Sequence, residues 1–400
     1  MRISTTQIYA QSLTNVNSSL VRLDELNSQN SSQKRINAPS DDAAGMGNVM
    51  ELRTYDQTLA TQVENATVVK GLLGSADDLL SQASEIMTSI LEQAEQASTG
   101  TYDLEQNQMM AEQMRGYLDS LVSIANSKSG NDYLFSGEAT DTSPYEYTTD
   151  VTLLGDSPAR SDIAEITGEF DKTTLVEFTT DGTIGVDSID YRFSTDGGES
   201  WDTGTLDATA VPPETTLNLG TISVEMNSGV AVTAADEDEG SQFIVRSALS
   251  YNGSEKATSV AISEKTEVNA NTVGHKAFGG LNSQTDDPYD DPNLFETISD
   301  AIAYMEIGDE SGVANCLEKL RAGNEALTTV SAEIGSSEEK TSFVMSSITL
   351  SRNRIATAIS SEEDINAAQL SIELTQANYV YQAVLKSAAS IMNTSIMDYL

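Results

Sequence analysis

The chain has 400 residues, enough for two or three domains, and its 62 Asp and Glu against 21 Lys and Arg give a formal net charge of −41. Such an acidic surface repels nucleic acid and anionic membranes, so we expect neither as a partner. The single cysteine, Cys316, excludes an intramolecular disulfide framework. The single histidine, His275, argues against a His-rich metal site or a Ser-His-Asp triad.

No segment has the roughly 20 consecutive apolar residues of a membrane span. Residues 1–7 also lack the apolar region of a cleavable signal peptide. These features predict a cytoplasmic chain, or one that is exported by a route that uses no such peptide.

Apolar residues near the N-terminus recur at spacings of four, three, four and three, which predicts one seam along a helix. They are Tyr9, Leu13, Val16, Leu20 and Leu23. The pattern ends near residue 31. Pro39 then keeps residue 38 out of helical geometry, and Ser40 or Asp41 is a suitable N-cap for the next helix.

The next segment predicts a long helical hairpin. Apolar residues follow helical spacing from about residue 42 to 97, and a second helix is expected over 103–127. At 1.5 Å per residue the first helix would be about 80 Å long, which is too long for a compact globule.

The middle of the chain has a different character. Pro39 is the only proline before Pro144, and none follows Pro292. Short alternating runs at 174–178, 189–193 and 221–226 predict strands between Gly-rich turns. Residues 141–290 hold 28 acidic and 7 basic side chains, about half of the net charge. We predict a small antiparallel sandwich or barrel that faces solvent.

Helices are predicted again from residue 293. One runs to about residue 306, and another covers about 311–357 with breaks near Gly323 and Gly335. A last helix is expected to begin at the cap formed by residues 360–363. Its apolar side chains form the most regular heptad pattern of the chain. They are Leu370, Leu374, Ala377, Tyr381, Val384, Ala388 and Ile391.

These features predict an α+β fold, with a long helical coiled-coil core formed by both chain ends and an inserted antiparallel β domain. The predicted parts are terminal polymerisation helices (1–40 and 360–400), a helical core domain (41–140 and 293–359) and an acidic β domain (141–292). Helices that are apolar on one face only are marginal in isolation. The two heptad patterns therefore predict either intramolecular bundle packing or a surface for polymerisation.

Several segments resemble the bacterial flagellin superfamily and, within it, the hook–filament junction family. They are residues 1–5 (Met-Arg-Ile-Ser-Thr), 36–42 (Ile-Asn-Ala-Pro-Ser-Asp-Asp), 132–137 (Asp-Tyr-Leu-Phe-Ser-Gly) and 390–400 at the C-terminus. The resemblance covers 1–140 and 293–400. Asp-Asp-Ala-Ala-Gly at 41–45 and Gln-Ala-Ser-Thr-Gly-Thr at 96–101 look instead like filament flagellin, so the filament subunit is the alternative.

The resemblance implies a structural adaptor that polymerises through its paired terminal helices and does no catalysis. It implies contacts with the first hook-associated protein below, with flagellin above, and with further copies in a ring-like homo-oligomer. It further implies a flagellar export chaperone, type III export without a cleaved signal, and an extracellular place in the flagellum at the hook–filament junction.

Residues 194–201 (Ser-Thr-Asp-Gly-Gly-Glu-Ser-Trp) match the Asp-box of β-propellers, which is a hairpin turn away from the active site. One copy favours a structural hairpin anchored by Trp201. A surface glycan-binding module on a helical stalk is the alternative from another functional class.

The acidic runs at 236–239 and 286–292 lack the ligand spacing of an EF-hand loop. A solvated turn and a linker are the simpler interpretations, with calcium binding as the alternative. His275 and Cys316 are most simply structural. We find no nucleophile–base pair, phosphate loop or metal cluster, so we predict no catalytic residue, no metal and no cofactor.

Overall fold

The computed structural model describes residues 5–155, 157–168, 170–235 and 240–397. The chain divides into two compact units. The first, here called the terminal unit, comprises residues 1–64 and 344–400; the second, the central unit, comprises residues 65–343. Within the described residues, no helix combines the length and the apolar character needed to cross a membrane.

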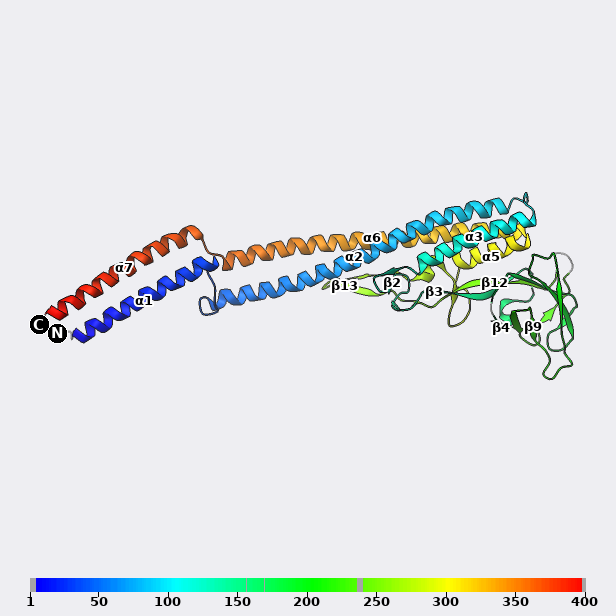
Figure 1. Cartoon of the computed structure of the whole chain (residues 1–400), viewed down its shortest axis with the longest axis horizontal. Coiled ribbons are helices and arrows are strands. Elements are labelled where there is room, and N and C mark those ends of the chain that lie inside the picture. The colour runs from blue at the N-terminus through cyan, green and yellow to red at the C-terminus, as the bar shows by residue number, and fades with distance from the viewer. Residues whose placement is uncertain (1–4, 156, 169, 236–239, 398–400) are drawn as a thin grey trace. The chain divides into compact units, whose positions relative to one another are not determined.

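The terminal unit is helical. Helix α1 (Thr5–Ser32) packs along α7 (Ala367–Met397), so that the two ends of the chain lie side by side (Figure 1). The unit also contains the beginning of α2 (Ala43–Ala97) and the end of α6 (Glu310–Glu363). The pairing of both ends confirms the helical core that the sequence predicts.

The helices of the central unit are closed by local caps. Asp103 accepts a hydrogen bond from the Gln106 amide in a capping box at the start of α3 (Leu104–Ala125). Asn293 caps α5 (Leu294–Ile307), which ends at Gly308 in the left-handed region (φ 76°). Helix α3 packs against α5. A short helix, α4 (Gly274–Phe278), precedes α5 in the chain.

Two predicted helix boundaries are wrong. Helix α6 is continuous through Gly323 and Gly335, because a single glycine costs only about 1 kcal/mol when packing supports the helix. Residues 360–363 end α6 rather than begin α7. Asn366 is the cap of α7, since its Oδ1 accepts from the amides of Ala368 and Gln369 at 3.1 and 3.3 Å.

The β strands form one large sheet and several small ones. The large sheet has the order β15 (Leu281–Asn282), β12 (Gln242–Tyr251), β5 (Thr174–Phe178), β7 (Ile189–Ser194) and β8 (Asp202–Leu206), and β3 (Tyr145–Leu153) also pairs with β12. A second sheet has the order β4 (Ile163–Gly168), β10 (Ile222–Met226) and β9 (Thr216–Asn218). Apart from the parallel β12–β15 pair, these ladders are antiparallel.

Three short two-stranded ladders and one 3-10 turn complete the described secondary structure of the insert and its borders. They are β1 (Lys128–Ser129) with β2 (Asp132–Tyr133), β6 (Gly182–Thr183) with β11 (Ala231–Val232), β13 (Ser259–Ser263) with β14 (Thr266–Asn269), and the 3-10 turn Arg160–Asp162.

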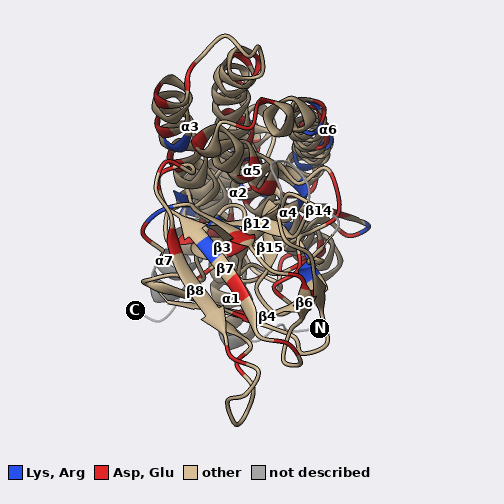
Figure 2. Ribbon diagram, turned by 90° about the vertical axis from the view of Figure 1, so that its right-hand side faces the viewer, with Lys and Arg blue, Asp and Glu red and all other residues tan. Residues whose placement is uncertain are grey.

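The apolar faces of the large and the second sheet share one core. Its fully buried members include Val176, Phe178, Val224, Phe243 and Val245. The middle of the chain is therefore a sandwich-like pair of sheets, which confirms the α+β class with an inserted antiparallel domain. Acidic residues are scattered over helices, strands and loops and outnumber Lys and Arg (Figure 2).

The opposite face of the large sheet packs on helix α5. Leu175 and Ile244 of the sheet cluster with Ala303 of α5, and Trp201 and Tyr304 pack against them. The insert and the neighbouring helices therefore belong to the same compact unit. The predicted boundaries at 140 and 292 lie inside this central unit.

Candidate assembly interface

Helix α1 turns an apolar face toward α7. Tyr9, Val16 and Leu23, seven residues apart, are half-buried, and Leu26 is buried with 1% of its surface exposed. Two half-buried serines, at positions 12 and 19, occupy the rest of this face. The face is a short coiled-coil seam in which serine replaces part of the apolar packing.

The predicted positions on α7 lie on the matching face. Leu370 is buried, with 3% of its surface exposed. The others on this face are half-buried: Leu374, Ala377, Tyr381, Val384 and Ala388. The side chain of Ile391 lies outside the described residues.

The prediction that all five apolar positions of α1 share one seam is wrong. Leu13 and Leu20 are 68% and 45% exposed. Positions three and four residues beyond Tyr9 lie on opposite sides of it, because a helix turns 100° per residue. The α7 contact uses the side that contains Leu26 and leaves the side that contains Leu13 in solvent.

Helix α7 carries a second apolar stripe on its outer side. Ile372 and Tyr379 are 68% and 75% exposed and lie seven residues apart, hence on one face. Ile372 is two residues from Leu374, about 200° around the helix, so this face points away from the seam. Exposed apolar side chains gathered on one element are typical of a protein contact.

The seam is flanked by one polar contact and closed at its end by another. Arg22 Nη2 lies 3.0 Å from Glu373 Oε2, and both side chains are exposed, so this pair is worth less than about 1 kcal/mol. Glu363, at the end of α6, is different because its side chain is only 7% exposed.

Glu363 joins three elements of the terminal unit. Its carboxylate accepts from Lys34 Nζ at 2.7 Å and from Arg53 Nη2 at 2.6 Å, and its backbone oxygen accepts from the Arg35 amide at 2.6 Å. Burial raises the pKa of this carboxyl, but the hydrogen bonds from Lys34 and Arg53 outweigh it and hold the pKa below 4.5. We call Glu363, Lys34 and Arg53 the ionic joint.

The loop between α1 and α2 is built by two adjacent aspartates. Asp41 accepts from the amides of Asn37 and Ala38, both at 2.9 Å, and these bonds lower its pKa. Asp42 caps α2 through the Gly45 amide at 2.9 Å. The predicted cap, Ser40 or Asp41, is therefore wrong by one or two positions.

Gly45 has a steric role in the same loop. A Cβ atom there would lie 2.6 Å from the Asp42 carboxylate and 2.8 Å from Cδ1 of Ile36. Ile36 is 1% exposed, so it has little freedom to move aside. The pattern Ile-Asn-Ala-Pro-Ser-Asp-Asp-Ala-Ala-Gly thus describes a rigid turn.

Below the loop, α2 and α6 pack together within the terminal unit. Leu59 of α2 clusters with Ile348 and Ile355 of α6. Arg352 donates to Asp56 through Nε at 2.8 Å and through Nη2 at 3.2 Å, a bidentate contact that lowers the pKa of Asp56. The ionic joint therefore links the α1–α7 pair to a packed two-helix support.

The Asp-box is a structural turn between β7 and β8. Asp196 accepts from the Ser200 amide at 2.9 Å and from the Ser194 hydroxyl at 2.7 Å, and bonds from Ser200 and Ser194 lower the pKa of Asp196 to about 2. Trp201 is half-buried under the Arg192 guanidinium, 4.2 Å from the ring centroid. It is thus not a free platform for a sugar ring.

The remaining candidates have structural surroundings. Cys316 is buried and His275 stacks on Tyr289 with ring centroids 4.3 Å apart. Over the described ranges, no group of three or more His, Cys, Asp or Glu side chains is arranged to hold a metal ion. The acidic run 236–239 lies outside those ranges, and so do residues 1–4 and 398–400.

These features can be set beside known proteins. Residues 3–140 match the bacterial flagellin N-terminal helical region. The N-terminal third of the chain is therefore similar to this family. The match includes the whole of α1, the rigid turn at 36–45 and the helical hairpin, and it confirms the resemblance to the flagellin superfamily.

Curated relatives show the same kinship. The chain is 27% identical over 150 residues to flagellar hook-associated protein 3 of Salmonella typhimurium, covering 37% of this chain and 47% of that protein. It is 27% identical over 146 residues to the Escherichia coli protein of the same name, covering 36% and 46%. Flagellin B of Helicobacter pylori is 31% identical over 101 residues, covering 25% and 20%. The chain thus matches about half the length of the hook-associated relatives.

Solved structures of similar proteins include a hook-associated protein from Vibrio parahaemolyticus, described as putative. It has 12% identity, a TM-score of 0.49, and coverage of 81% of this chain and all of that one. Hook-associated protein-3 from Legionella pneumophila has 11% identity and a TM-score of 0.40, with coverage of 78% and 98%.

Sequence reasoning does not identify the ionic joint, nor does it identify Arg246, a buried arginine on β12. The acidic run that contains Glu363 predicts a helix cap, and no sequence pattern marks Arg246. For the ionic joint, the sequence does contain a usable feature. Lys34 and Arg35 are the only basic pair in the first loop, and the run at 362–364 is acidic, so the two segments have opposite charge. For Arg246, the only feature in the sequence is a charged residue within an apolar run.

Proposed function

We propose that this chain is the structural adaptor that joins the bacterial flagellar hook to the flagellin filament. The observation that carries the proposal is the sequence match, over 150 and 146 residues, to hook-associated protein 3 of two bacteria. The adaptor acts mechanically: the chain contributes helical surfaces to an assembly and carries out no chemical step.

The assembly surface in this proposal is the α1–α7 pair. The seam holds the two chain ends together, and the outward residues are the ones available to neighbours. The exposed apolar side chains of that surface include Leu13, Leu20, Ile372 and Tyr379. Burying such side chains at subunit contacts supplies roughly 25 cal/mol per Å² of apolar area.

The proposed partners are those that the resemblance to the hook–filament junction family implies. They are the first hook-associated protein, flagellin, further copies of this chain in a ring, and an export chaperone that holds the terminal helices before assembly. We propose export through the flagellar type III apparatus without a cleaved signal.

A filament subunit is the competing function, supported by the 31% identity to a flagellin over 101 residues. Immunogold electron microscopy of cells that carry epitope-tagged protein separates the two. A single ring of label at the hook tip supports the adaptor. Label along the whole filament supports the flagellin alternative and contradicts the adaptor. A glycan-binding module is less favoured because Trp201 is packed beneath Arg192.

A further inference from the structure

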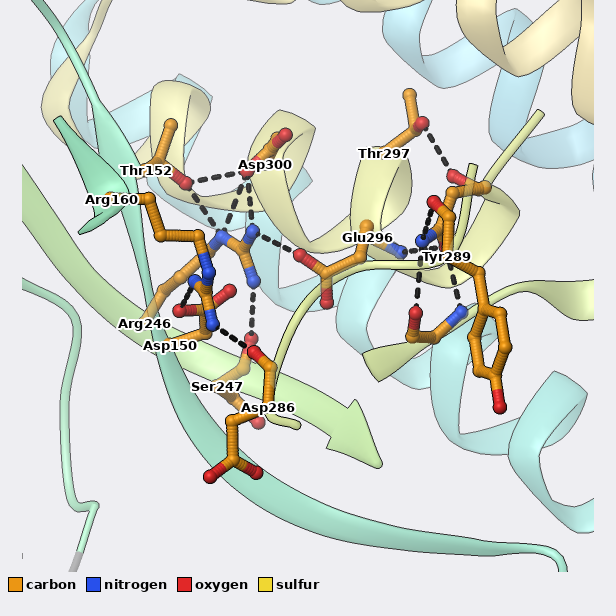
Figure 3. Close-up of polar contacts among 12 residues, drawn as sticks. Asp150, Thr152, Arg160, Arg246, Ser247, Asp286, Tyr289, Glu296, Thr297 and Asp300 are labelled. Carbon is orange, nitrogen blue, oxygen red and sulfur yellow. Dashed lines mark hydrogen bonds and ion pairs between the residues drawn. The ribbon is translucent and has the colours of Figure 1, made fainter. Parts of the chain in front are cut away.

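Arg246 lies at the contact between the insert and helix α5. It stands on β12, the strand that pairs with β3, β5 and β15, and only 3% of its surface is exposed. Its Nε donates to Thr152 Oγ1 at 2.6 Å and to Asp300 Oδ1 at 2.8 Å, and its Nη2 donates to Glu296 Oε2 at 2.7 Å (Figure 3). We call Arg246, Glu296 and Asp300 the sheet–helix cluster.

The two carboxylates come from one face of α5. Glu296 and Asp300 are four residues apart and therefore neighbours on the helix surface. Both point at the guanidinium in Figure 3, across the layer between helix and sheet. A buried guanidinium is tolerated only while its partners stay within reach, because an isolated buried charge costs several kcal/mol. The observed position of the sheet on α5 satisfies this condition.

Two further contacts connect the insert to the segments at either end of α5. Arg160 binds the Asp150 carboxylate of β3 and the backbone oxygen of Asp286, which ties β3 to the segment that leads back to α5 (Figure 3). At the other end of α5, a Cβ atom on Gly197 of the Asp-box turn would lie 2.6 Å from the Glu306 backbone oxygen. The turn and the helix are thus in close contact.

Some buried polar atoms in and beside the cluster have no hydrogen-bond partner. Glu296 Oε1 and the Ser299 hydroxyl on α5 are buried without a hydrogen-bond partner, and so is Asp150 Oδ2. Such groups make buried ion pairs poor sources of stability, and apolar residues of similar volume often replace them without loss. Setting a unique packing arrangement is the better-supported role for such a cluster.

We propose that the sheet–helix cluster fixes the register of the insert on α5 and makes the two one cooperative folding unit. In this arrangement the insert is a rigid part of the subunit and not an appendage that moves on linkers. This inference does not depend on the proposed function, because it concerns contacts within one chain.

Hydrogen–deuterium exchange of the full-length protein, resolved by peptide mass spectrometry, tests the proposal. Arg246→Met removes the charge at similar length and leaves the buried Glu296 carboxylate and the partly exposed Asp300 carboxylate uncompensated. We expect exchange in β12 and α5 to accelerate together, by roughly a hundredfold or more, because uncompensated buried charges carry a large penalty. Arg321→Met, which removes an exposed pair with Glu95, is the control and should leave both segments unchanged.

Two further variants keep the test decisive if Arg246→Met does not fold. Arg246→Lys keeps the positive charge but loses the planar guanidinium, which donates to several acceptors at once. It should give a smaller acceleration of amide exchange that is still parallel in β12 and α5. The triple replacement of Arg246, Glu296 and Asp300 by Met, Met and Leu should restore protection in both segments to within tenfold of the starting protein. Acceleration confined to β12, or no acceleration in either segment, overturns the proposal.

Discussion

The carboxylate of Glu363 at the end of α6 lies 2.6 Å from the Arg53 guanidinium on α2 and 2.7 Å from the Lys34 ammonium in the loop after α1. This one side chain therefore touches the support helices and the entrance to the terminal pair. We therefore expect the direction of the α1–α7 pair within the terminal unit to depend on this contact.

Replacing Glu363 by Gln should loosen the ionic joint without changing its shape. Lys34 and Arg53 are nearly half exposed and regain water, so we expect a loss of about 1–2 kcal/mol rather than the full cost of a buried pair. Pulsed electron spin resonance between labels on α2 and α7 should show a broader distance distribution. Glu373→Gln is the matched control. An unchanged distribution for Glu363→Gln would mean that the joint does not orient the pair.

The same joint should weaken in acid. The folded pKa of Glu363 lies below its usual 4.5, so its contribution to stability is complete above that value and is lost as pH falls through the folded pKa. Asp41, Asp42 and Asp56 shift in the same direction. The stability difference between the wild-type chain and Glu363→Gln, followed by denaturant titration from pH 6 to pH 3, isolates the Glu363 contribution. It should shrink toward zero, and a difference that grows would contradict the assignment.

Replacing Leu374 by Asp should separate the terminal pair. Leu374 is half-buried on the α7 seam, and an unpaired charge there costs on the order of 1–3 kcal/mol. We expect faster amide exchange along both α1 and α7, loss of motility and loss of attached filaments. The neighbouring Glu373→Gln, which removes only an exposed pair, should behave as wild type. Normal filaments on Leu374→Asp cells would remove the seam from the assembly surface.

Replacing Tyr379 by Asp should affect assembly and leave the free subunit intact. Tyr379 is 75% exposed on the outer face of α7, so its loss costs the monomer little. Circular dichroism and thermal melting of the purified subunit should match wild type, whereas motility and filament retention should fall. Gln382→Asp places the same charge at an exposed position of the same helix as a control. If both variants swim equally well, the outer stripe is not a contact surface.

Excising residues 141–290 and joining the flanks with a short Gly/Ser linker should damage the helices of the central unit. Helix α5 would lose the cover of Leu175 and Ile244 over Ala303, and Glu296 and Asp300 would lose Arg246. We expect aggregation or a strongly lowered melting temperature by size-exclusion chromatography and circular dichroism. A monomeric variant whose helices melt as in the full chain would show that the insert is removable.

The extent of sequence prediction differs between local and distant contacts. Proline placement and heptad spacing predicted the long helices because these signals depend only on neighbouring residues. The burial of Leu26 instead of Leu13 could not be predicted, since both lie beside the same stripe and α7 decides between them. Asn366 as the true cap of α7 was masked by the acidic run before it.

In the candidate site too, features set by neighbouring residues could be predicted and contacts between distant residues could not. The α7 face that contains Leu370 and Leu374 was predictable from one helix. The partners of Glu363 and Arg246 were not, because each cluster joins residues that lie 50 to more than 300 positions apart. The acidity of the insert suggested a solvent-facing, removable domain. Net charge does not reveal that Arg246 is buried and faces α5.

Trp201 is the only tryptophan in the chain, and it packs beside Leu175, Ile244 and Ala303 where the large sheet meets α5. The protein therefore contains a built-in optical reporter at that boundary. Undocking of the sheet would bring water to the indole and move its emission to longer wavelength, with no label attached. Tyrosine contributes little when excitation is at 295 nm. Intrinsic fluorescence can thus follow the contact between sheet and helix in real time.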